Sequence, residues 1–558
     1  MHRLTALLLN ALCLTLLLAA CRDPFEPNKP APYTLGGTVS GLPAGASVVL
    51  GTGSATTTVS ANGAYTFAQG FTQGTAYAVI VLAQPAAAQC FVANATGTIA
   101  TASVANVTVT CTAIILNAWT WTGGSSTATA LAGSYGTRGV ASTLNQPGAR
   151  WHAQRWTDAG GRLWLFGGLG YDANGNVASY LNDLWVYERS TARWEWVSGA
   201  QSVDAAGSYG TLGTAASAST PGARAYALSW IDGTGTLWLM GGYGHDSSGT
   251  LGYLNDLWSY TPGTGNWAWM GGSSSASAQP GVYGTLGSAA KTNQPGARAD
   301  AATWADGSGR LWLFGGTGYD AAGVQGTLAD LWSYSTSTAS WTWVGGPQTS
   351  ATGAGVYGSL GSAASTNQPG GRASARAWTD GSGRLWLFGG YGRDSVAALG
   401  YLNDLWRYDP LAATWTWMSG SALANATGSY GTLGGAAAGN TPGARDRAAA
   451  VQDPAGNFWL LGGSGYDGSG QLGYLNDLWE YTPATGLWTW TSGSSLGGAL
   501  PGVYGTQGQA STSNTPGARN GAVLWSDTSG YLWLLGGNGY NSSGALNGYL
   551  NDLWEFTP

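Results

Sequence analysis

Short apolar segments and turn residues alternate along the last four fifths of this chain, a pattern that predicts strands rather than helices. In one stretch, apolar positions gather at residues 225–231, 237–241, 256–260 and 267–270. The second of these segments is apolar on both faces, as expected for a strand buried between neighbouring sheets. The pattern predicts a four-stranded antiparallel meander in which short turns alternate with longer loops.

The same pattern recurs along the chain. Each copy contains a Gly-Gly pair, then an Asp-Leu-Trp string and, in all copies but the last, a Trp-x-Trp string. The Asp-Leu-Trp strings are spaced 73 to 75 residues apart and begin at Asp183, Asp256, Asp330, Asp404, Asp477 and Asp552. A Pro-Gly-Ala-Arg string or a close variant precedes each copy. Such a fixed period indicates an array of one repeated supersecondary unit.

The first and last copies are out of phase. A Trp-x-Trp string at Trp119 stands before the first complete unit, whereas the chain ends at Pro558 without such a string after Asp552. We therefore predict that the segment around Trp119 supplies the fourth strand of the last sheet and closes six blades into a ring. Closure removes the exposed sheet edges that favour aggregation.

The order of the Gly-Gly pair, the Asn-Asp-x-Trp element and the following tryptophan resembles that of kelch repeats, over residues 118–558. The resemblance implies an all-β fold, a six-bladed kelch-like β-propeller similar to the central domain of galactose oxidase. One departure is the period. Kelch units run near 50 residues, whereas each unit here carries an insert of about 20 residues between the fourth strand and the next first strand.

Residues 33–113 contain no tryptophan and have short β-branched segments separated by turn signals. They predict a small antiparallel β-sandwich similar to bacterial immunoglobulin-like modules, which would serve as a spacer or an adhesion module. Cys90 and Cys111 are the two cysteines outside the leader. In an exported protein such a pair is expected to form a disulfide; the alternative, a metal site, lacks further ligands.

The first 21 residues have the pattern of an export signal, in which Arg3 precedes an apolar stretch at 7–18 that is too short to span a bilayer. The string that ends at Cys21 resembles the bacterial lipobox, which implies lipidation of Cys21; an ordinary secretory signal is the alternative. Residues 22–32 predict an extended, proline-rich tether. We therefore expect a lipid-anchored protein of the cell envelope, at the outer membrane or the cell surface.

Composition narrows the possible partners. The formal net charge is −6, and Lys29 and Lys291 are the only lysines. Nucleic acid binding needs a basic surface that replaces counterions, so we predict no nucleic acid partner and no polybasic membrane patch. The 30 tryptophans and 27 tyrosines supply the large apolar groups that disordered chains lack.

Two sets of residues recur in the loop that leads from each fourth strand to the next first strand. The tyrosines are candidates for contact area on a binding face, and the arginines are candidates for clamping an anion. The alternatives are that each tyrosine holds its insert on its own unit, and that each arginine pairs with the Asp of the third strand. The residues are Tyr135, Tyr209, Tyr283, Tyr357, Tyr430 and Tyr504, with Arg150, Arg224, Arg298, Arg372, Arg445 and Arg519.

The loop between the second and third strands carries an acid or amide in each copy, at Asp172, Asp246, Asp320, Asp394, Asp467 and Asn541. Asp before small residues and Gly is ordinary turn chemistry. A calcium ion needs six to eight oxygens gathered in one place, which one Asp per loop does not provide. We predict turns here and no metal site.

Catalytic signals are weak. Copper chemistry like that of galactose oxidase needs histidines and a cysteine-linked tyrosine, but the repeat region has no cysteine and only His152 and His245. No nucleophile–base pair or phosphate loop stands out, so we predict a non-enzymatic protein without a cofactor. The expected function is binding of a protein or glycan partner on the long-loop face. The alternative is a carbohydrate-active enzyme such as a sialic-acid mutarotase, which an asymmetric cluster of acids in the channel would favour.

Overall fold

The structure is a computed structural model that describes residues 33–85, 88–128, 130–176, 178–276, 278–350, 353–546 and 548–558. The expected leader, lipidation site Cys21 and tether lie outside these residues. The described chain is all-β, and its only helical element is the 3-10 turn Arg189–Thr191. No helix in the described residues is long and apolar enough to cross a membrane.

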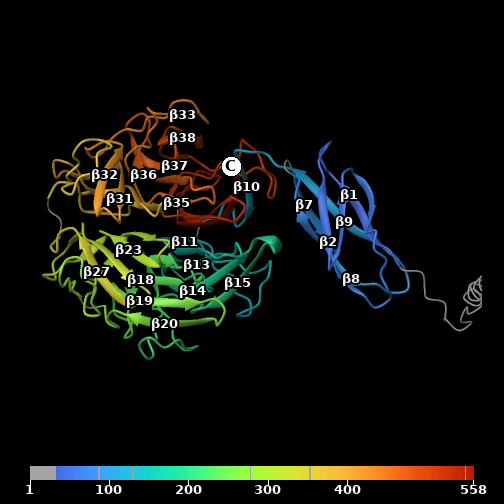
Figure 1. The fold of residues 1–558 in the computed structure, drawn as a ribbon, viewed down its shortest axis with the longest axis horizontal. Coiled ribbons are helices and arrows are strands. Elements are labelled where there is room, and N and C mark those ends of the chain that lie inside the picture. Colours follow the sequence, from blue (N-terminus) through green and yellow to red (C-terminus); the bar gives the residue numbers. More distant parts are fainter. Residues whose placement is uncertain are drawn as a thin grey trace, which may run out of the picture. The chain divides into compact units, whose positions relative to one another are not determined.

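The chain divides into two compact units between Ile114 and Ile115. The first unit contains nine strands in its described part (Figure 1). One sheet has the order β4-β1-β9-β7, another has the order β3-β2-β6, and β5 pairs with β8. The strands are β1 Leu35–Ser40, β2 Val48–Thr52, β3 Ala55–Val59, β4 Gly63–Thr66, β5 Ala76–Ala78, β6 Ile80–Ala83, β7 Ala88–Ala93, β8 Thr96–Thr98 and β9 Val104–Ala113.

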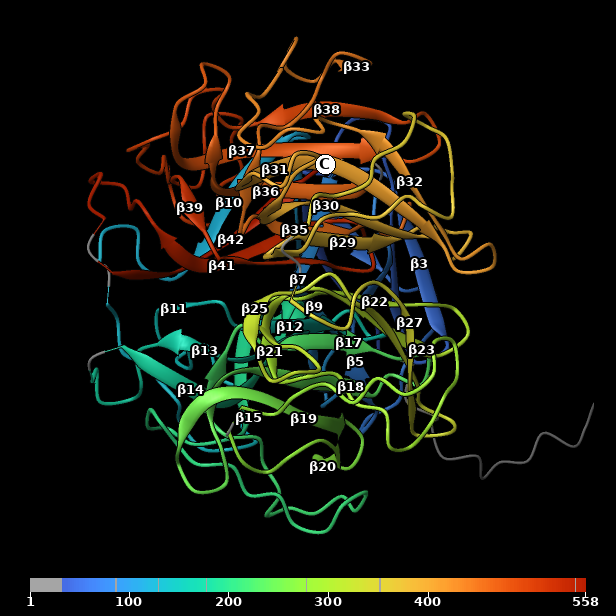
Figure 2. The same cartoon turned by 90° about the vertical axis from the view of Figure 1, so that its left-hand side faces the viewer.

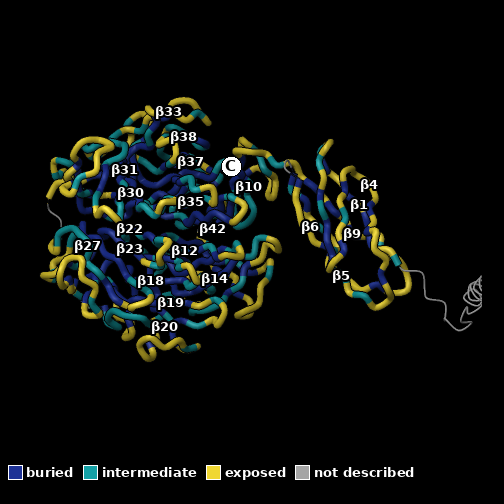
Figure 3. Tube along the Cα trace, viewed as in Figure 1, coloured by how far each residue is buried: buried dark blue, intermediate teal, exposed yellow. Residues whose placement is uncertain are grey.

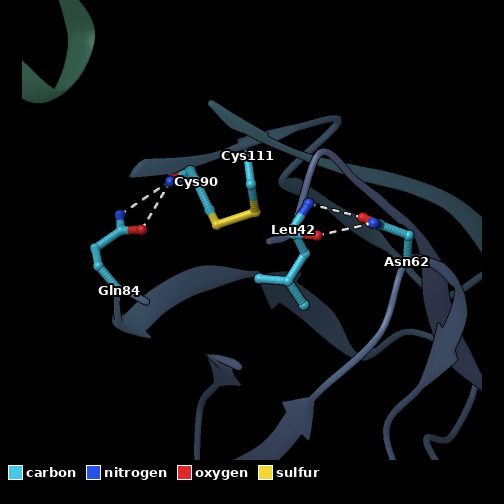
Figure 4. The surroundings of a disulfide bond; sticks show 5 residues. All are labelled: Leu42, Asn62, Gln84, Cys90 and Cys111. Carbon is cyan, nitrogen blue, oxygen red and sulfur yellow. Dashed lines mark hydrogen bonds between the residues drawn. A yellow bond between two sulfur atoms is a disulfide. The ribbon is translucent and has the colours of Figure 1, made fainter. Parts of the chain in front are cut away.

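A disulfide joins β7 and β9 of the first unit. Cys90 and Cys111 face each other in the antiparallel register of these strands and are bonded, which confirms the predicted pair. Gln84 brackets Cys90 with two hydrogen bonds, donating to its carbonyl and accepting from its N–H (Figure 4). The pairing of β1 with β9 is parallel, so the expectation of a purely antiparallel sandwich was wrong.

The second unit consists of repeated antiparallel sheets. In one repeat, β16 (Arg224–Ala225) and β17 (Leu228–Ile231) both pair with β18 (Leu237–His245), which pairs with β19 (Leu251–Thr261) and then β20 (Asn266–Gly271). The predicted meander order is therefore correct. The described residues contain six such repeats, of which the third is divided between two sheets.

The remaining strands follow the same order. They are β10 Ala118–Gly123; β11 Arg150–Trp151, β12 Gln154–Thr157, β13 Leu163–Gly170, β14 Ser179–Glu188 and β15 Arg193–Ser198; β21 Arg298–Ala299, β22 Ala302–Ala305, β23 Arg310–Phe314, β24 Thr317–Tyr319, β25 Gln325–Thr327, β26 Leu331–Ser335 and β27 Ser340–Gly345; β28 Arg372–Ala373, β29 Arg376–Thr379, β30 Leu385–Arg393, β31 Leu399–Asp409 and β32 Thr414–Ser419; β33 Ala436–Ala437, β34 Arg445–Asp446, β35 Ala449–Gln452, β36 Phe458–Tyr466, β37 Leu472–Thr482 and β38 Leu487–Ser492; and β39 Arg519–Asn520, β40 Val523–Ser526, β41 Leu532–Gly539 and β42 Tyr549–Thr557.

In five repeats the glycine pair lies inside the second strand and not after it, and in the third repeat it lies between β23 and β24. Gly241 and Gly242 of β18 have φ angles of 58° and 94°, and the register with β19 shifts at this point. A Cβ on Gly241 would lie 2.7 Å from the carbonyl oxygen of Arg298 in the next repeat. Glycine is therefore required both for the left-handed backbone and for the close approach of the neighbouring sheet.

The N-terminal and C-terminal ends of the second unit pair with each other. Strand β10 runs antiparallel to β42, with Trp119 opposite Phe556 and Trp121 opposite Trp554. The order β10-β42-β41 gives the last repeat its fourth strand. Trp119 is only 1% exposed, so this pairing buries a large apolar surface.

Hydrophobic cores lie between consecutive sheets. Each core joins one repeat to the next, and one of them joins the last repeat to the first through Trp525, Trp533 and Leu163. The first strands β12, β17, β22, β29, β35 and β40 contact one another in this order, and β40 also contacts β12. Figure 2 shows the first strands towards the middle of the unit and fourth strands such as β20 and β38 towards its outside. Buried residues follow the strands, and exposed residues lie mainly in the loops (Figure 3).

Each insert covers the outer edge of a sheet. In the second repeat, Ala216 forms a bridge with Trp267 of β20, and the N–H of Gly213 donates to the carbonyl oxygen of Trp269. Equivalent bridges form in the other repeats, at Ser142, Ala290, Ala364 and Ser511, or as the short strand β33 against β38. The inserts thus satisfy backbone groups that an open edge strand would leave unpaired.

Candidate functional site

The recurring arginines and tyrosines meet in one buried cluster per repeat. In the third repeat the guanidinium of Arg298 donates two hydrogen bonds to Asp330, at 2.7 and 2.8 Å, and one to the carbonyl oxygen of Gly315. The Tyr283 hydroxyl and the Trp332 indole N–H each donate to Asp330 at 2.7 Å. The carboxylate is therefore saturated with donors, and the arginine is fully paired.

The same cluster forms in all six repeats, where the tyrosine hydroxyl lies 2.6–2.7 Å from the carboxylate. The six arginines are at most 2% exposed and the six tyrosines 4–7%. Burial and the neighbouring aspartate raise the pKa of each of these tyrosines. These twelve side chains therefore hold the insert and the strands of each repeat together. Each tyrosine holds its insert on its own unit and each arginine pairs with the third-strand Asp, so these buried side chains are not exposed to a partner.

The loop acids form turns. Asp246 is 2% exposed and accepts backbone N–H groups from Ser248 and Thr250 through Oδ1 and from Ala276 through Oδ2. Burial alone would raise the pKa of Asp246, but these hydrogen bonds outweigh it and hold the pKa below its ordinary value. The carboxylate ties the loop between the second and third strands to the start of the next insert.

A different set of tyrosines is partly exposed at the long-loop ends of the strands. They stand just after the glycine pair or early in the third strand, where the two strands face each other, as Tyr243 faces Tyr253. The set is Tyr171, Tyr180, Tyr243, Tyr253, Tyr319, Tyr391, Tyr401, Tyr466, Tyr474, Tyr540 and Tyr549, of which Tyr391 is 40% exposed and the others are half-buried. We call this set the tyrosine belt.

The tyrosine belt continues from one repeat to the next. The ring centroids of Tyr180 and Tyr243 are 5.9 Å apart, and those of Tyr253 and Tyr319 are 6.0 Å apart. Similar contacts link Tyr401 with Tyr466, Tyr474 with Tyr540 and Tyr171 with Tyr549. Thr327 occupies the equivalent third-strand position in the third repeat, as its register with Thr317 shows, so the belt has a gap there.

One position breaks each first strand and links the repeats. Two residues after the arginine, the backbone enters the left-handed region, with φ angles of 51–58°. Each N–H at this position donates to the carbonyl oxygen of the equivalent residue in the preceding repeat, and the bond from His152 to Gly521 completes the circuit. The residues are His152, Tyr226, Asp300, Ser374, Arg447 and Gly521. The continuous first strand predicted at residues 225–231 was wrong at this point.

Six different residues, five of them with a side chain, thus occupy one backbone position. A left-handed backbone favours Gly and costs other residues about 1–2 kcal/mol, yet only one repeat uses Gly. His152 packs between Trp151 and Tyr226, with ring centroids 4.4 and 4.3 Å away. Five repeats therefore retain an unfavourable residue at the centre of the array, which is typical of functional positions.

Charged groups gather at this centre. The Asp300 carboxylate lies 3.8 Å from Nδ1 of His152 and accepts a hydrogen bond from the Ser374 hydroxyl at 3.0 Å. Asp446 lies 3.6 Å from the guanidinium of Arg447. Three of the buried polar atoms here have no hydrogen-bond partner among the described residues, namely Nε2 of His152, Oδ1 of Asp446 and Nε of Arg447. Unpartnered buried polar atoms are uncommon and call for an explanation.

Burial shifts the proton equilibria of these groups. It raises the pKa of Asp446 to about 6, against the opposing effect of Arg447, and it raises the pKa of Asp300 above its ordinary value. Burial, aided by Arg447 and Arg376, lowers the pKa of His152 well below its usual range, so this imidazole is neutral at pH 7. Burial therefore disfavours the charged forms of Asp446, Asp300 and His152. Each of these residues stands in a single repeat, so the cluster is not repeated around the array.

A cavity of about 420 Å³ runs between the six first strands and is lined by Arg155, Asp300, Arg376 and His152 together with hydroxyl and amide side chains. Arg155 reaches across it to donate to the carbonyl oxygen of Ala450. Arg376 makes no hydrogen bond or salt bridge to any described residue, and its Nε is buried without a partner. This volume suits a small ligand.

Neither the tyrosine belt nor the central charged cluster was predicted from the sequence. The tyrosines lie in strings that were interpreted as turns and third strands. A comparison of the six copies, position by position after the arginine, contains the signal for the centre, because every copy has a different residue two positions after the arginine, whereas the alanine that follows it is the same in all six. No protein-family model matches the sequence, and a search of curated proteins finds no significant match.

Proposed function

We propose that this protein is a cell-envelope lipoprotein that binds a protein or glycan partner through the long-loop face of its repeat unit. The tyrosine belt is the observation that carries this proposal. Tyrosine rings supply large, rigid contact area at low entropic cost, and here they are held partly exposed on strands rather than on mobile loops. The gap at Thr327 makes the face asymmetric, which a specific partner requires.

In this proposal the repeat unit is a closed, six-bladed, kelch-like β-propeller. The pairing of β10 with β42, the contact of β40 with β12 and the circuit of backbone hydrogen bonds through His152 and Gly521 support closure. The order of motifs along the sequence supports the kelch type. A rigid ring of this kind would hold the tyrosine belt in one fixed arrangement.

The proposed location rests on the sequence. A lipid on Cys21, followed by the tether at 22–32 and the first unit, would hold the repeat unit at the membrane or cell surface. The disulfide between Cys90 and Cys111 fits an oxidising compartment outside the cytoplasm.

The test is a glycan array together with a pull-down from cell-surface extracts, using the chain and two variants. Tyr253→Ala combined with Tyr401→Ala removes the belt on both sides of its gap and should weaken partner binding at least tenfold. Leu411→Ala changes a residue that is 99% exposed in a short turn between β31 and β32 and should leave binding unchanged. Equal binding by the double tyrosine variant would refute the assignment of the face.

A carbohydrate-active enzyme such as a sialic-acid mutarotase is the second candidate. It is favoured by the asymmetric central cluster, in which neutral His152 and the carboxyl of Asp300, whose pKa is raised, are placed to exchange protons. Exchange between sugar anomers, followed by NMR, tests it directly. Asp300→Asn should abolish catalysed exchange, whereas the tyrosine pair would not, because the tyrosines lie outside the proton path.

A further inference from the structure

The cavity between the first strands contains an excess of positive charge. Its described lining has two arginines, Arg155 and Arg376, against the single carboxylate of Asp300. Neither arginine forms a salt bridge within the described residues, and the only hydrogen bond of Arg155 goes to a backbone carbonyl group. A buried cation without a counter-ion is costly, so folding alone does not account for this pair.

Burial disfavours the charged form of both arginines. It lowers the pKa of Arg155 to about 10, with a further contribution from Arg376, and it lowers the pKa of Arg376 as well. Asp300 and Asp446 oppose this lowering of the pKa of Arg376, but neither carboxylate forms a salt bridge with Arg376 within the described residues. An anion placed between the two guanidinium groups would satisfy both of them, and their planar forks match a carboxylate geometrically.

The lining also contains uncharged polar side chains, which lie among alanine, tryptophan and other apolar residues. Gln154, Thr157, Gln452 and Ser526 line the cavity together with the arginines. His152 also lines this space and is 7% exposed, and its Nε2 has no hydrogen-bond partner among the described residues. Amides, hydroxyls and a neutral imidazole are groups that exchange hydrogen bonds with ligand hydroxyls.

We propose that this cavity binds a small hydroxy acid, with its carboxylate between Arg155 and Arg376 and its hydroxyl groups on the polar lining and His152. The volume of about 420 Å³ lies within the range of small-ligand sites. This site is separate from the proposed partner surface at the tyrosine belt, and the two are tested independently.

The experiment compares D-gluconate with D-sorbitol by titration calorimetry on the full chain. The two probes share the same chain of hydroxyls and differ in the carboxylate. Gluconate should bind and sorbitol should bind at least tenfold more weakly. Arg155→Met and Arg376→Met should each weaken gluconate binding at least tenfold. Arg407→Met, which removes an arginine that stacks on Trp386 outside the cavity, should have no effect.

A second measurement does not depend on the variants folding. The chain has three histidines, so the imidazole signals of His152 can be assigned in NMR spectra with the help of His245→Gln. Gluconate should shift the His152 signals, and sorbitol should not. The proposal is overturned if gluconate neither binds nor shifts His152, if sorbitol binds equally, or if inorganic phosphate binds at the arginines while gluconate does not.

Discussion

Two kinds of buried charge coexist in the repeat unit, and they differ in how completely they are paired. The Arg298–Asp330 pair is satisfied on every side by Tyr283, Trp332 and backbone carbonyl groups. Arg376, by contrast, forms no hydrogen bond or salt bridge with the described residues, and its Nε is buried without a hydrogen-bond partner among them. Removing one partner of a buried ion pair is strongly destabilising because the other charge is left uncompensated, and a buried ion that lacks such a pair costs stability, which is typical of a functional position.

Removing the arginine from one of these paired clusters should cause a large loss of stability. Arg298→Met should lower the free energy of unfolding by about 3–5 kcal/mol, because it leaves Asp330 buried without its counter-ion. Urea denaturation measures the loss. Arg310→Met removes an exposed arginine at the start of β23 and is the matched control. Similar stability of both variants would contradict a structural role for the cluster.

The raised pKa of Asp446 predicts that the stability of the protein depends on pH. Its pKa is raised to about 6 in the folded protein, so the unfolded chain loses this proton first. Stability from this group is complete below the ordinary pKa and is lost as pH rises through about 6. The loss amounts to about 3 kcal/mol.

Asp446→Asn imitates the protonated form and should therefore stabilise the protein at pH 8 but not at pH 4, as urea denaturation at the two values would show. Asp409→Asn is the control with the opposite sign. Hydrogen bonds from the Ala412 and Leu411 N–H groups and the nearby Arg384 lower the pKa of Asp409, so its replacement should not stabilise the protein at pH 8. A gain of the same size in both variants would rule out burial of Asp446 as the cause.

At the scale of elements, each sheet is completed by chain segments from elsewhere. The inserts bridge to the fourth strands, as Ala216 does to Trp267, and β10 completes the sheet of β42. A fourth strand left open would expose backbone groups and a hydrophobic surface. The inserts therefore have a structural role in addition to lengthening the loops.

The contribution of β10 can be measured with one side chain. Trp119→Ala should lower the free energy of unfolding by about 3–5 kcal/mol, because a fully buried indole is replaced by a cavity against Trp554 and Phe556. Leu116→Ala, at a residue that is 60% exposed just before the strand, is the control. An unchanged urea midpoint for Trp119→Ala would mean that β10 does not stabilise the last sheet.

At the scale of the whole molecule, the two units have different chemistry. The first has a small core of aliphatic residues, tyrosine and phenylalanine without tryptophan, and one disulfide, whereas the second has tryptophan-rich cores between its sheets.

Anchoring is tested by changing the proposed lipidation site. Cys21→Ser should move the protein from the membrane fraction to the soluble fraction, because the lipid would be its only strong membrane attachment. Ala20→Ser, next to the cysteine, keeps the thiol and should leave the protein in the membrane fraction. Retention of Cys21→Ser in the membrane fraction would contradict the lipoprotein proposal.

The sequence by itself determined the strand content, the order of strands in each repeat, the disulfide and the pairing of the first strand with the last. These features depend on local periodicity and on repeated strings such as Asp-Leu-Trp, which are visible within one unit. It could not decide which tyrosines are buried. Tyr283 and Tyr253 both lie in recurring glycine-rich strings, and only the packing of an insert against its sheet separates them. The sequence copies mark the variable position, but only the tertiary structure assembles the central cluster, because His152, Asp300 and Arg376 come from different repeats and meet only when their first strands surround one cavity.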